Sequence, residues 1–192
     1  MKSAGLILAA GESRRMGFPK ALLDYRGETF LDRLTRLFAE RCDPVIVVLG
    51  ARAGELRARA ASLPGVHYVV NDDWAAGQTS SFLRGLREIP AEAPGILFTL
   101  VDHPAVAPET LDALLSAGGP LRIPRFNTRR GHPIWLSRRI LAEFQTLPAG
   151  AAARDIVRAH YPEATWLDVD DPGILADIDD PAAYRALTGV SV

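Results

Sequence analysis

Short runs of hydrophobic residues alternate with longer amphipathic segments over the first 117 residues of the chain. The runs are continuous and rich in leucine and β-branched residues: 5–9, 45–49, 66–70 and 96–101. Such runs are typical of strands that helices cover on both faces of a parallel sheet. Between them lie segments with hydrophobic residues at helical spacing, clearest in the first: 29–41, 52–62, 78–88 and 108–117. This βαβα order predicts a three-layer, doubly wound α/β fold with a mostly parallel sheet.

The second half of the chain follows a less regular pattern. Two further strands are predicted at 121–126 and 131–136, joined by a polar loop, and they form an antiparallel element. After them come predicted helices at 137–146 and 151–160, a strand at 165–169 and a helix at 181–187. The sequence contains no repeat, no low-complexity tract and no linker long enough to divide it. We therefore expect one domain that spans residues 1–192.

The balance of charges limits the partners that the protein can bind. Lys and Arg total 22 against 23 Asp and Glu, so no bulk positive charge draws the protein to nucleic acid or to an anionic membrane. Hydrophobic residues make up 48% of the chain, yet no hydrophobic run approaches the roughly 20 residues that span a bilayer. The single cysteine, Cys42, cannot form an internal disulfide, which fits a reducing compartment. We expect a cytoplasmic protein that binds neither nucleic acid nor membranes.

The segment after the first predicted strand carries the strongest chemical signal. Ligands of parallel α/β sheets bind at the carboxyl ends of the strands, where this segment lies. Gly11 and Gly17 allow backbone N–H groups to approach a phosphate closely, and Arg14, Arg15 and Lys20 supply fixed positive charge. The segment lacks both the Gly-Lys-Ser/Thr of a P-loop and the G-x-G-x-x-G of a dinucleotide site. It therefore predicts a site for the triphosphate of an NTP.

A carboxylate marks the end of the fourth predicted strand. Asp102 emerges there at the same edge of the sheet as the first loop, and we predict that it holds Mg²⁺ against the phosphates. Asp before X-Pro is also common in turns, but the position relative to the first loop favours a metal ligand. Mg²⁺ commonly binds one or two carboxylates together with phosphates and water. Near the C-terminus Asp180 precedes a proline as a helix N-cap would, which leaves Asp177 or Asp179 as the second ligand.

A run of small polar residues follows the third predicted strand and opens a helix. Their hydroxyl and amide groups can hydrogen-bond a base or a ribose, and the helix N-terminus favours an anion. The alternative is simple helix capping by Thr79 or Ser80. The residues of this run that we expect to contact the nucleotide are Asn71, Gly77, Gln78, Ser80 and Ser81.

The histidines carry weaker signals. For His132, which stands between a glycine and a proline, two interpretations stay open: it contacts the acceptor, or it is a hydrogen-bonded histidine of a strand. His67, His103 and His160 do not have the spacing of zinc ligands along the chain. We therefore do not expect a zinc site.

The first loop resembles that of a known family. Leu8-Ala9-Ala10-Gly11-x-x-x-Arg15-Met16-Gly17-x-x-Lys20 is similar to the signature loop of the MobA-like NTP transferases, which include the molybdenum-cofactor guanylyl- and cytidylyltransferases. The likeness continues in the expected order at Gly77-Gln-x-Ser-Ser, Asp102-x-Pro104, Gly131-His132-Pro133 and Asp177-Ile-Asp179-x-Pro181. It implies a Rossmann-like nucleotidyltransferase fold. It also implies Mg²⁺-dependent transfer of a nucleoside monophosphate from an NTP to a small phosphorylated acceptor, with release of pyrophosphate.

The resemblance also implies a role for each matching residue. Asp102 and Asp179 would be the metal ligands between the reacting phosphates. Lys20 and Arg15, which with Asp102 form the catalytic set, would stabilise charge on the α-phosphate and on the departing pyrophosphate. The nucleotide is expected to contact the five polar residues named above, His132, and the loop residues Leu8, Ala9, Ala10, Gly11, Arg14 and Gly17.

The same likeness favours one pair of substrates. Ala9-Ala10-Gly11 and the Gly-His-Pro segment resemble the cytidylyltransferase branch, whereas the guanylyl branch tends to carry Ala-Gly-Gly. This implies CTP as the donor, molybdopterin-bound molybdenum cofactor as the acceptor, and transient contact with a molybdoenzyme. One departure is His103, which stands where the cytidylyl branch usually has glutamine. The alternatives are a nucleotidyltransferase for another small phosphate such as a sugar 1-phosphate, and a non-catalytic nucleotide-binding chaperone or regulator of a molybdoenzyme.

Overall fold

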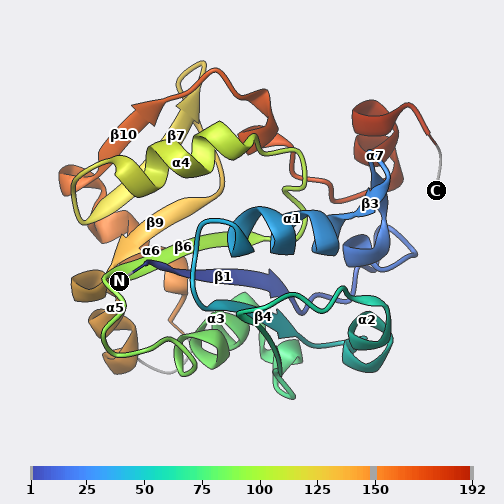
Figure 1. The fold of residues 1–192 in the computed structure, drawn as a ribbon, viewed down its shortest axis with the longest axis horizontal. Coiled ribbons are helices and arrows are strands. Elements are labelled where there is room, and N and C mark those ends of the chain that lie inside the picture. Colours follow the sequence, from blue (N-terminus) through green and yellow to red (C-terminus); the bar gives the residue numbers. More distant parts are fainter. Residues whose placement is uncertain (1, 148–150, 191–192) are drawn as a thin grey trace.

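The structure is a computed structural model that describes residues 2–147 and 151–190. Within these residues its centre is a sheet of eight strands (Figure 1). Each predicted strand run contributes a strand, and 45–49, 66–70 and 121–126 have the predicted bounds. Across the sheet the order is β10 (Thr165–Asp168), β7 (Leu121–Phe126), β9 (Ile134–Ser137), β6 (Gly95–Leu100), β1 (Ala4–Ala9), β4 (Val45–Leu49) and β5 (Val66–Val70), and β8 (Arg129–Arg130) pairs with β7.

Most neighbouring strands run parallel. β6, β1, β4 and β5 are parallel to one another, and β7 is parallel to β10. β9 lies antiparallel between β6 and β7, and β8 is antiparallel to β7. The predicted doubly wound, mostly parallel α/β sheet with an antiparallel element in its second half is thus confirmed. Because β9 runs the other way, its first residue, Ile134, lies opposite Phe98 near the carboxyl end of β6.

Helices cover both faces of the sheet and give the three predicted layers. One hydrophobic cluster joins the sheet to α1 (Phe30–Ala39), α2 (Ala53–Arg59), α4 (Pro108–Ser116) and α7 (Pro181–Thr188). A second cluster joins the opposite face to α3 (Gln78–Leu86), α5 (Arg138–Glu143) and α6 (Ala153–Ala159). Figure 1 shows α1 and α4 along the same side of the sheet, with α7 beside β3. None of the helices in the described part of the chain is long and apolar enough to cross a membrane.

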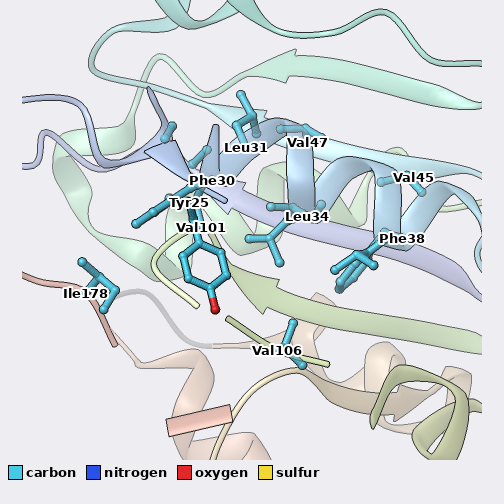
Figure 2. Close-up of a cluster of buried hydrophobic side chains, with 14 of the residues drawn as sticks. Tyr25, Phe30, Leu31, Leu34, Phe38, Val45, Val47, Val101, Val106 and Ile178 are labelled. Atoms are coloured by element: carbon cyan, nitrogen blue, oxygen red, sulfur yellow. The ribbon is translucent and has the colours of Figure 1, made fainter. Parts of the chain in front are cut away.

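The first cluster explains why the central strands are continuous hydrophobic runs. Every residue of β1 and β4 is buried, because helices cover both of their faces. On one face Phe30, Leu34 and Phe38 of α1 are fully buried and belong to the same cluster as Val45 and Val47 of β4 (Figure 2). Burial of one such side chain contributes about 1.5–3 kcal/mol. The fold that positions the site therefore rests on this layer.

Some short elements differ from the sequence prediction. β2 (Asp24–Tyr25) and β3 (Glu28–Thr29) form a hairpin that was not predicted, with positive φ angles of 60° at Arg26 and 85° at Gly27 in its turn. Strands of two residues are too short to produce a recognisable hydrophobic period. The helix predicted at 137–146 ends as an α-helix at Glu143 and continues as a 3₁₀-helix.

The strand predicted at 131–136 begins only at Ile134. Pro133 has no N–H to donate to a strand ladder. The N–H of His132 instead donates to the carbonyl oxygen of Ile174 at 3.1 Å, outside the sheet. The Gly-His-Pro segment is therefore attached to the loop that precedes α7.

A charged network joins α6 to α5. His160 Nε2 lies 2.9 Å from Glu143, its Nδ1 contacts Glu163, and Arg139 pairs with Glu163 at 2.6 Å. Burial lowers the pKa of His160, but the hydrogen bonds to Glu143 and Glu163 outweigh burial and raise that pKa above its ordinary value. The imidazole in its protonated form therefore stabilises the contact between the two helices.

Candidate active site

A cavity of about 570 Å³ opens at the carboxyl ends of β1 and β6. Its volume lies in the range of about 300–1,000 Å³ that holds small-molecule ligands. The first loop and Asp102 both line it, so the structure brings together the two features that the sequence pattern predicts at one edge of the sheet. The predicted site residues in the lining are Leu8, Ala10, Gly11, Arg14, Arg15, Lys20, Gly77, Gln78, Ser81, Asp102 and Asp179.

The remaining predicted contacts lie elsewhere. Ala9 is buried in the first hydrophobic cluster, and Gly17 closes the turn of the loop by donating its N–H to the carbonyl oxygen of Ser13 at 3.1 Å. His132 lines a second, neighbouring cavity. The lining also contains residues that the sequence did not single out, notably Ser13 and Trp74.

Asn71 supports the cavity from behind. It is buried, and its amide donates to Ser80 Oγ at 2.9 Å and to Ser81 Oγ at 3.0 Å. Ser80 also donates to the carbonyl oxygens of Asp73 and Gly77. In this structure Asn71 and Ser80 therefore shape the turn before α3, and Ser81 reaches the cavity.

Buried contacts fix the position of the first loop. Met16 is 4% exposed and belongs to the first hydrophobic cluster, and the Ser13 hydroxyl accepts the N–H of Lys20 at 3.1 Å. On the other side the loop packs directly on Gly50, where an added Cβ would lie 2.5 Å from the carbonyl oxygen of Ala10. The loop can occupy this position only because Gly50 has no side chain.

Lys20 lies at the centre of the charges in the cavity. Its side chain is 13% exposed, and its Nζ lies 3.3 Å from Asp102 Oδ2 and also contacts Asp179, which Arg15 pairs with from the other side. Hydrogen bonding to Lys20, and then to Arg15, holds the pKa of Asp179 below its ordinary value. Burial raises the pKa of Asp102, and Lys20 offsets part of that rise. Two cations suited to phosphates thus face carboxylates suited to a metal.

Three carboxylates gather at this point and fit a divalent cation. Burial raises the pKa of Asp177, and the charges of Asp102 and Asp179 raise it further. The Oδ1 atom of Asp102 is buried and has no hydrogen-bond partner among the described residues. A buried carboxylate oxygen is costly unless a cation or a donor satisfies it. Carboxylate oxygens of this kind suit a divalent cation such as Mg²⁺ or Mn²⁺.

The loop between β10 and α7, which carries Asp171, Asp177 and Asp179, is attached to the edge of the sheet. Asp171 is 6% exposed and accepts hydrogen bonds from Ala107 N at 2.8 Å and from Thr110 Oγ1 at 2.7 Å, at the start of α4. Farther along, the N–H of Ile178 donates to the carbonyl oxygen of Asp102 at 3.0 Å. The residues on either side of Ile178 are therefore held next to Asp102.

Two histidines lie beside Asp102. The ring centroids of His103 and His132 are 4.9 Å apart, and His103 Nε2 lies 3.7 Å from Asp102 Oδ1. Burial lowers the pKa of His103 to about 4 and likewise that of His132 to about 4, so both rings are neutral at neutral pH. His103 was not among the predicted site residues. Its position next to Asp102 was the available signal, but its other acidic neighbour, Asp177, is distant in the sequence.

A second cavity of about 480 Å³ adjoins the first and shares Gln78 and Leu100 with it. His132 lines this cavity, and the arginines in its lining are exposed, whereas most of its apolar residues are buried. The arginines are Arg130, Arg154 and Arg158, and the apolar residues include Phe82, Phe98, Ile123, Ile134, Leu136 and Phe144. The site thus offers two adjacent compartments, one highly charged and one largely apolar with basic groups at its mouth.

Residues 5–164 match the MobA-like NTP transferase domain. The chain belongs to this family. This MobA-like protein is 36% identical over 189 residues to nicotine blue oxidoreductase of Paenarthrobacter nicotinovorans, with 91% of each chain covered. It is 28% identical to the molybdenum cofactor cytidylyltransferase of Escherichia coli, over 92% of this chain and 90% of the relative. It is 31% identical to a probable molybdenum cofactor guanylyltransferase of Mycobacterium avium, over 97% and 95% of the two chains.

Solved structures show the same fold. The crystal structure of Rv0371c from Mycobacterium tuberculosis superposes with a TM-score of 0.82 at 32% identity and covers 99% of both chains. A structure of Rv0371c in complex with manganese gives a TM-score of 0.77 at 31% identity, with 98% of this chain and 99% of that one covered. The family and the fold class implied by the first loop are therefore confirmed. The MobA-like protein resembles molybdenum cofactor guanylyl- and cytidylyltransferases, in a family that typically uses divalent metals.

Proposed function

We propose that this MobA-like protein acts in the cytoplasm as a Mg²⁺-dependent cytidylyltransferase that transfers CMP from CTP to molybdopterin-bound molybdenum cofactor and releases pyrophosphate. The observation that carries the proposal is the convergence of Lys20, Arg15 and the carboxylates Asp102 and Asp179 on one cavity beside the first loop. Opposite charges arranged in this way suit a triphosphate and its metal ion.

The reaction is an in-line displacement at the α-phosphorus of the NTP. An acceptor phosphate oxygen forms the new bond, the bond to the β-phosphate breaks, and pyrophosphate leaves. Two anions must meet, so neutralising and aligning them are the main tasks. No side-chain base is required, because a phosphate monoester is already ionised at neutral pH.

Residues of the chain supply this neutralisation. Lys20 and Arg15 leave their carboxylate partners and stabilise charge on the α-phosphate and on the leaving pyrophosphate. Of the loop 10–17 that we expected to cradle the triphosphate, residues 10–15 line the cavity and offer their backbone N–H groups, because those of Met16 and Gly17 are bonded to Ser13. Asp102 and Asp179 would hold Mg²⁺, which neutralises phosphate charge when it is bound. The release of Lys20 from Asp179 thus couples nucleotide binding to the freeing of a metal ligand.

The second cavity is the compartment that we assign to the acceptor. Its buried apolar residues suit a flat ring system, and its exposed arginines suit a phosphate. It adjoins the first cavity at Gln78 and Leu100, so an acceptor held there approaches the nucleotide from one side. We further propose a transient contact with a molybdoenzyme that receives the product.

The test is release of pyrophosphate from CTP, GTP, ATP or UTP in the presence of Mg²⁺ and molybdopterin-bound cofactor. We expect release with CTP and its loss in Asp102→Asn. Activity in Asp179→Ala but not in Asp177→Ala would make Asp177, instead of Asp179, the second metal ligand. A preference for GTP would overturn the proposal that CTP is the donor. Thermal stabilisation by an NTP without release of pyrophosphate would favour a non-catalytic nucleotide-binding regulator. Release of pyrophosphate with a sugar 1-phosphate instead of the cofactor would favour a nucleotidyltransferase for that class of acceptor.

The likeness to nicotine blue oxidoreductase supports a second candidate, an oxidoreductase that acts on nicotine blue or a similar compound. The identity of 36% covers 91% of both chains. The first loop lacks the G-x-G-x-x-G pattern of dinucleotide sites, which argues against this candidate. Incubation with nicotine blue and NADH or NADPH tests it. Oxidation of the nicotinamide with no pyrophosphate release from any NTP would replace the transferase proposal.

A further inference from the structure

The two carboxylate oxygens of Asp102 face different groups. Oδ2 lies 3.3 Å from Lys20 Nζ, on the side of the nucleotide cavity. Oδ1 lies 3.7 Å from His103 Nε2, is buried, and has no hydrogen-bond partner in residues 2–147 and 151–190. A separation of 3.7 Å is too long for a hydrogen bond. The Oδ1 side of Asp102 therefore presents an unsatisfied buried oxygen to a nearby imidazole nitrogen.

Asp177 completes this group from another part of the chain. One ligand atom each from Asp102, His103 and Asp177 lies within 4.8 Å of the other two. The His103 side chain is only 8% exposed, whereas Asp177 is exposed and leaves a route for an ion from solvent. Two ligands about 2.1 Å from one ion can be up to about 4.2 Å apart, so small side-chain movements bring all three into coordinating range.

We propose that Asp102 Oδ1, His103 and Asp177 form a site for a first-row transition-metal dication, of which Mn²⁺ is the representative, and that this site prefers Mn²⁺ to Mg²⁺. Mg²⁺ selects oxygen ligands and gives up its water reluctantly. Imidazole suits transition metals, while carboxylates suit both Mn²⁺ and Mg²⁺. His103 is thus the residue that makes the site selective.

The proposed site differs from the magnesium position of the proposed function, on which it rests only through the shared residue Asp102. Asp179 is not a member, because it pairs with Lys20 and Arg15 on the Oδ2 side. An ion on the Oδ1 side needs neither the nucleotide nor any movement of Lys20. The site should therefore fill in the absence of NTP.

Titration of the nucleotide-free protein with Mn²⁺, followed by the electron paramagnetic resonance signal of the free ion, tests this site directly. We expect Mn²⁺ to bind at least tenfold more tightly than Mg²⁺, measured by competition. His103→Gln and Asp177→Asn should each weaken Mn²⁺ binding at least tenfold. Asp170→Asn, which removes the same charge at an exposed position outside the cavity, should leave Mn²⁺ binding within about twofold of the wild type.

A spectroscopic measurement covers the case in which a variant folds poorly. Electron spin echo modulation of wild-type protein with bound Mn²⁺ should reveal an imidazole nitrogen as a ligand. Absence of that nitrogen, equal affinity for the two metals, or equal losses in Asp177→Asn and Asp170→Asn would each overturn the site. Pyrophosphate release with Mg²⁺ alone is measured separately. A protein that transfers nucleotide without selecting Mn²⁺ refutes this site only, and one that binds Mn²⁺ but releases no pyrophosphate refutes the proposed function only.

Discussion

Removal of the Lys20 side chain is the sharpest test of the catalytic arrangement. Lys20 is 13% exposed and is the one cation in contact with both Asp102 and Asp179 among the described residues. If its ammonium group stabilises charge that develops in the transition state, Lys20→Ala loses one preorganised donor. Such a loss lowers turnover by about 10²–10³, or about 3–4 kcal/mol. The exposed Arg15 compensates little, because a mobile cation in water is screened.

The same substitution should also reduce the stability of the protein in the absence of ligands. It removes charged hydrogen bonds to Asp102 and Asp179, which contribute about 1.5–3 kcal/mol. Added Mg²⁺ should restore part of that stability, since the ion replaces the missing positive charge. We expect a lower unfolding temperature in chelator and a larger upward shift with Mg²⁺ than the wild type shows.

The chain offers a matched control, because Lys2 is the only other lysine in its sequence and is exposed. Turnover is measured as pyrophosphate release at saturating NTP, and Lys2→Ala should behave as the wild type. A lysine-acylating reagent should modify Lys2 with or without NTP, whereas NTP should protect Lys20. Near-normal turnover in Lys20→Ala, or equal modification of Lys20 in the presence of NTP, would remove it from the mechanism.

Three further substitutions test the framework of the site. Gly50→Ala should displace the first loop, lower the stability of the protein by about 1–3 kcal/mol and weaken NTP binding. Gly54→Ala is the control, because an added Cβ there meets open space within a helix and should be neutral or stabilising. Calorimetry and NTP titration compare the two variants. Asp171→Asn should destabilise by about 1.5–3 kcal/mol, and an unchanged unfolding temperature would contradict its anchoring role. His160→Gln should lose more stability at about pH 5.5 than at about pH 9. Because folding raises the pKa of His160 above its ordinary value of 6.5, protonation of His160 stabilises the folded state at pH values below 6.5. This stabilisation is lost as the pH rises through the pKa of the folded state. Equal losses of stability in denaturant titrations at both pH values would refute the prediction.

The sequence predicts the central sheet well for a physical reason. β1 and β4 are covered on both faces, so every residue is buried, all but Gly5 are hydrophobic, and the run is visible without any knowledge of its neighbours. The β2–β3 hairpin has only two residues in each strand and no run to detect. The sequence also could not predict that β9 begins only at Ile134, because the hydrogen bond from His132 to Ile174 joins segments that are far apart in the sequence.

The candidate site, like the fold, could be predicted only in part from the sequence. The first loop and Asp102 could be placed together, because β1 and β6 are parallel neighbours and their carboxyl ends must meet at one edge. The proximity of Asp177 to His103 could not be predicted, since it depends on the hydrogen bond from Ile178 to Asp102 and on the path of an irregular loop. Motif order along a chain identifies which residues approach the sheet edge, but not which atoms face one another there.

The antiparallel strand β9 explains how one sheet edge carries two adjacent cavities, which the proposed reaction would use for two substrates. A parallel strand would begin at the opposite edge, whereas β9 begins beside the end of β6 and delivers His132 there. Phe98 then faces the apolar cavity, Asp102 faces the charged one, and Leu100 lines both. Group transfer between two anions requires separate compartments that meet at the reacting atoms. One reversed strand in a mostly parallel sheet therefore places the two cavities side by side at the carboxyl end of β6.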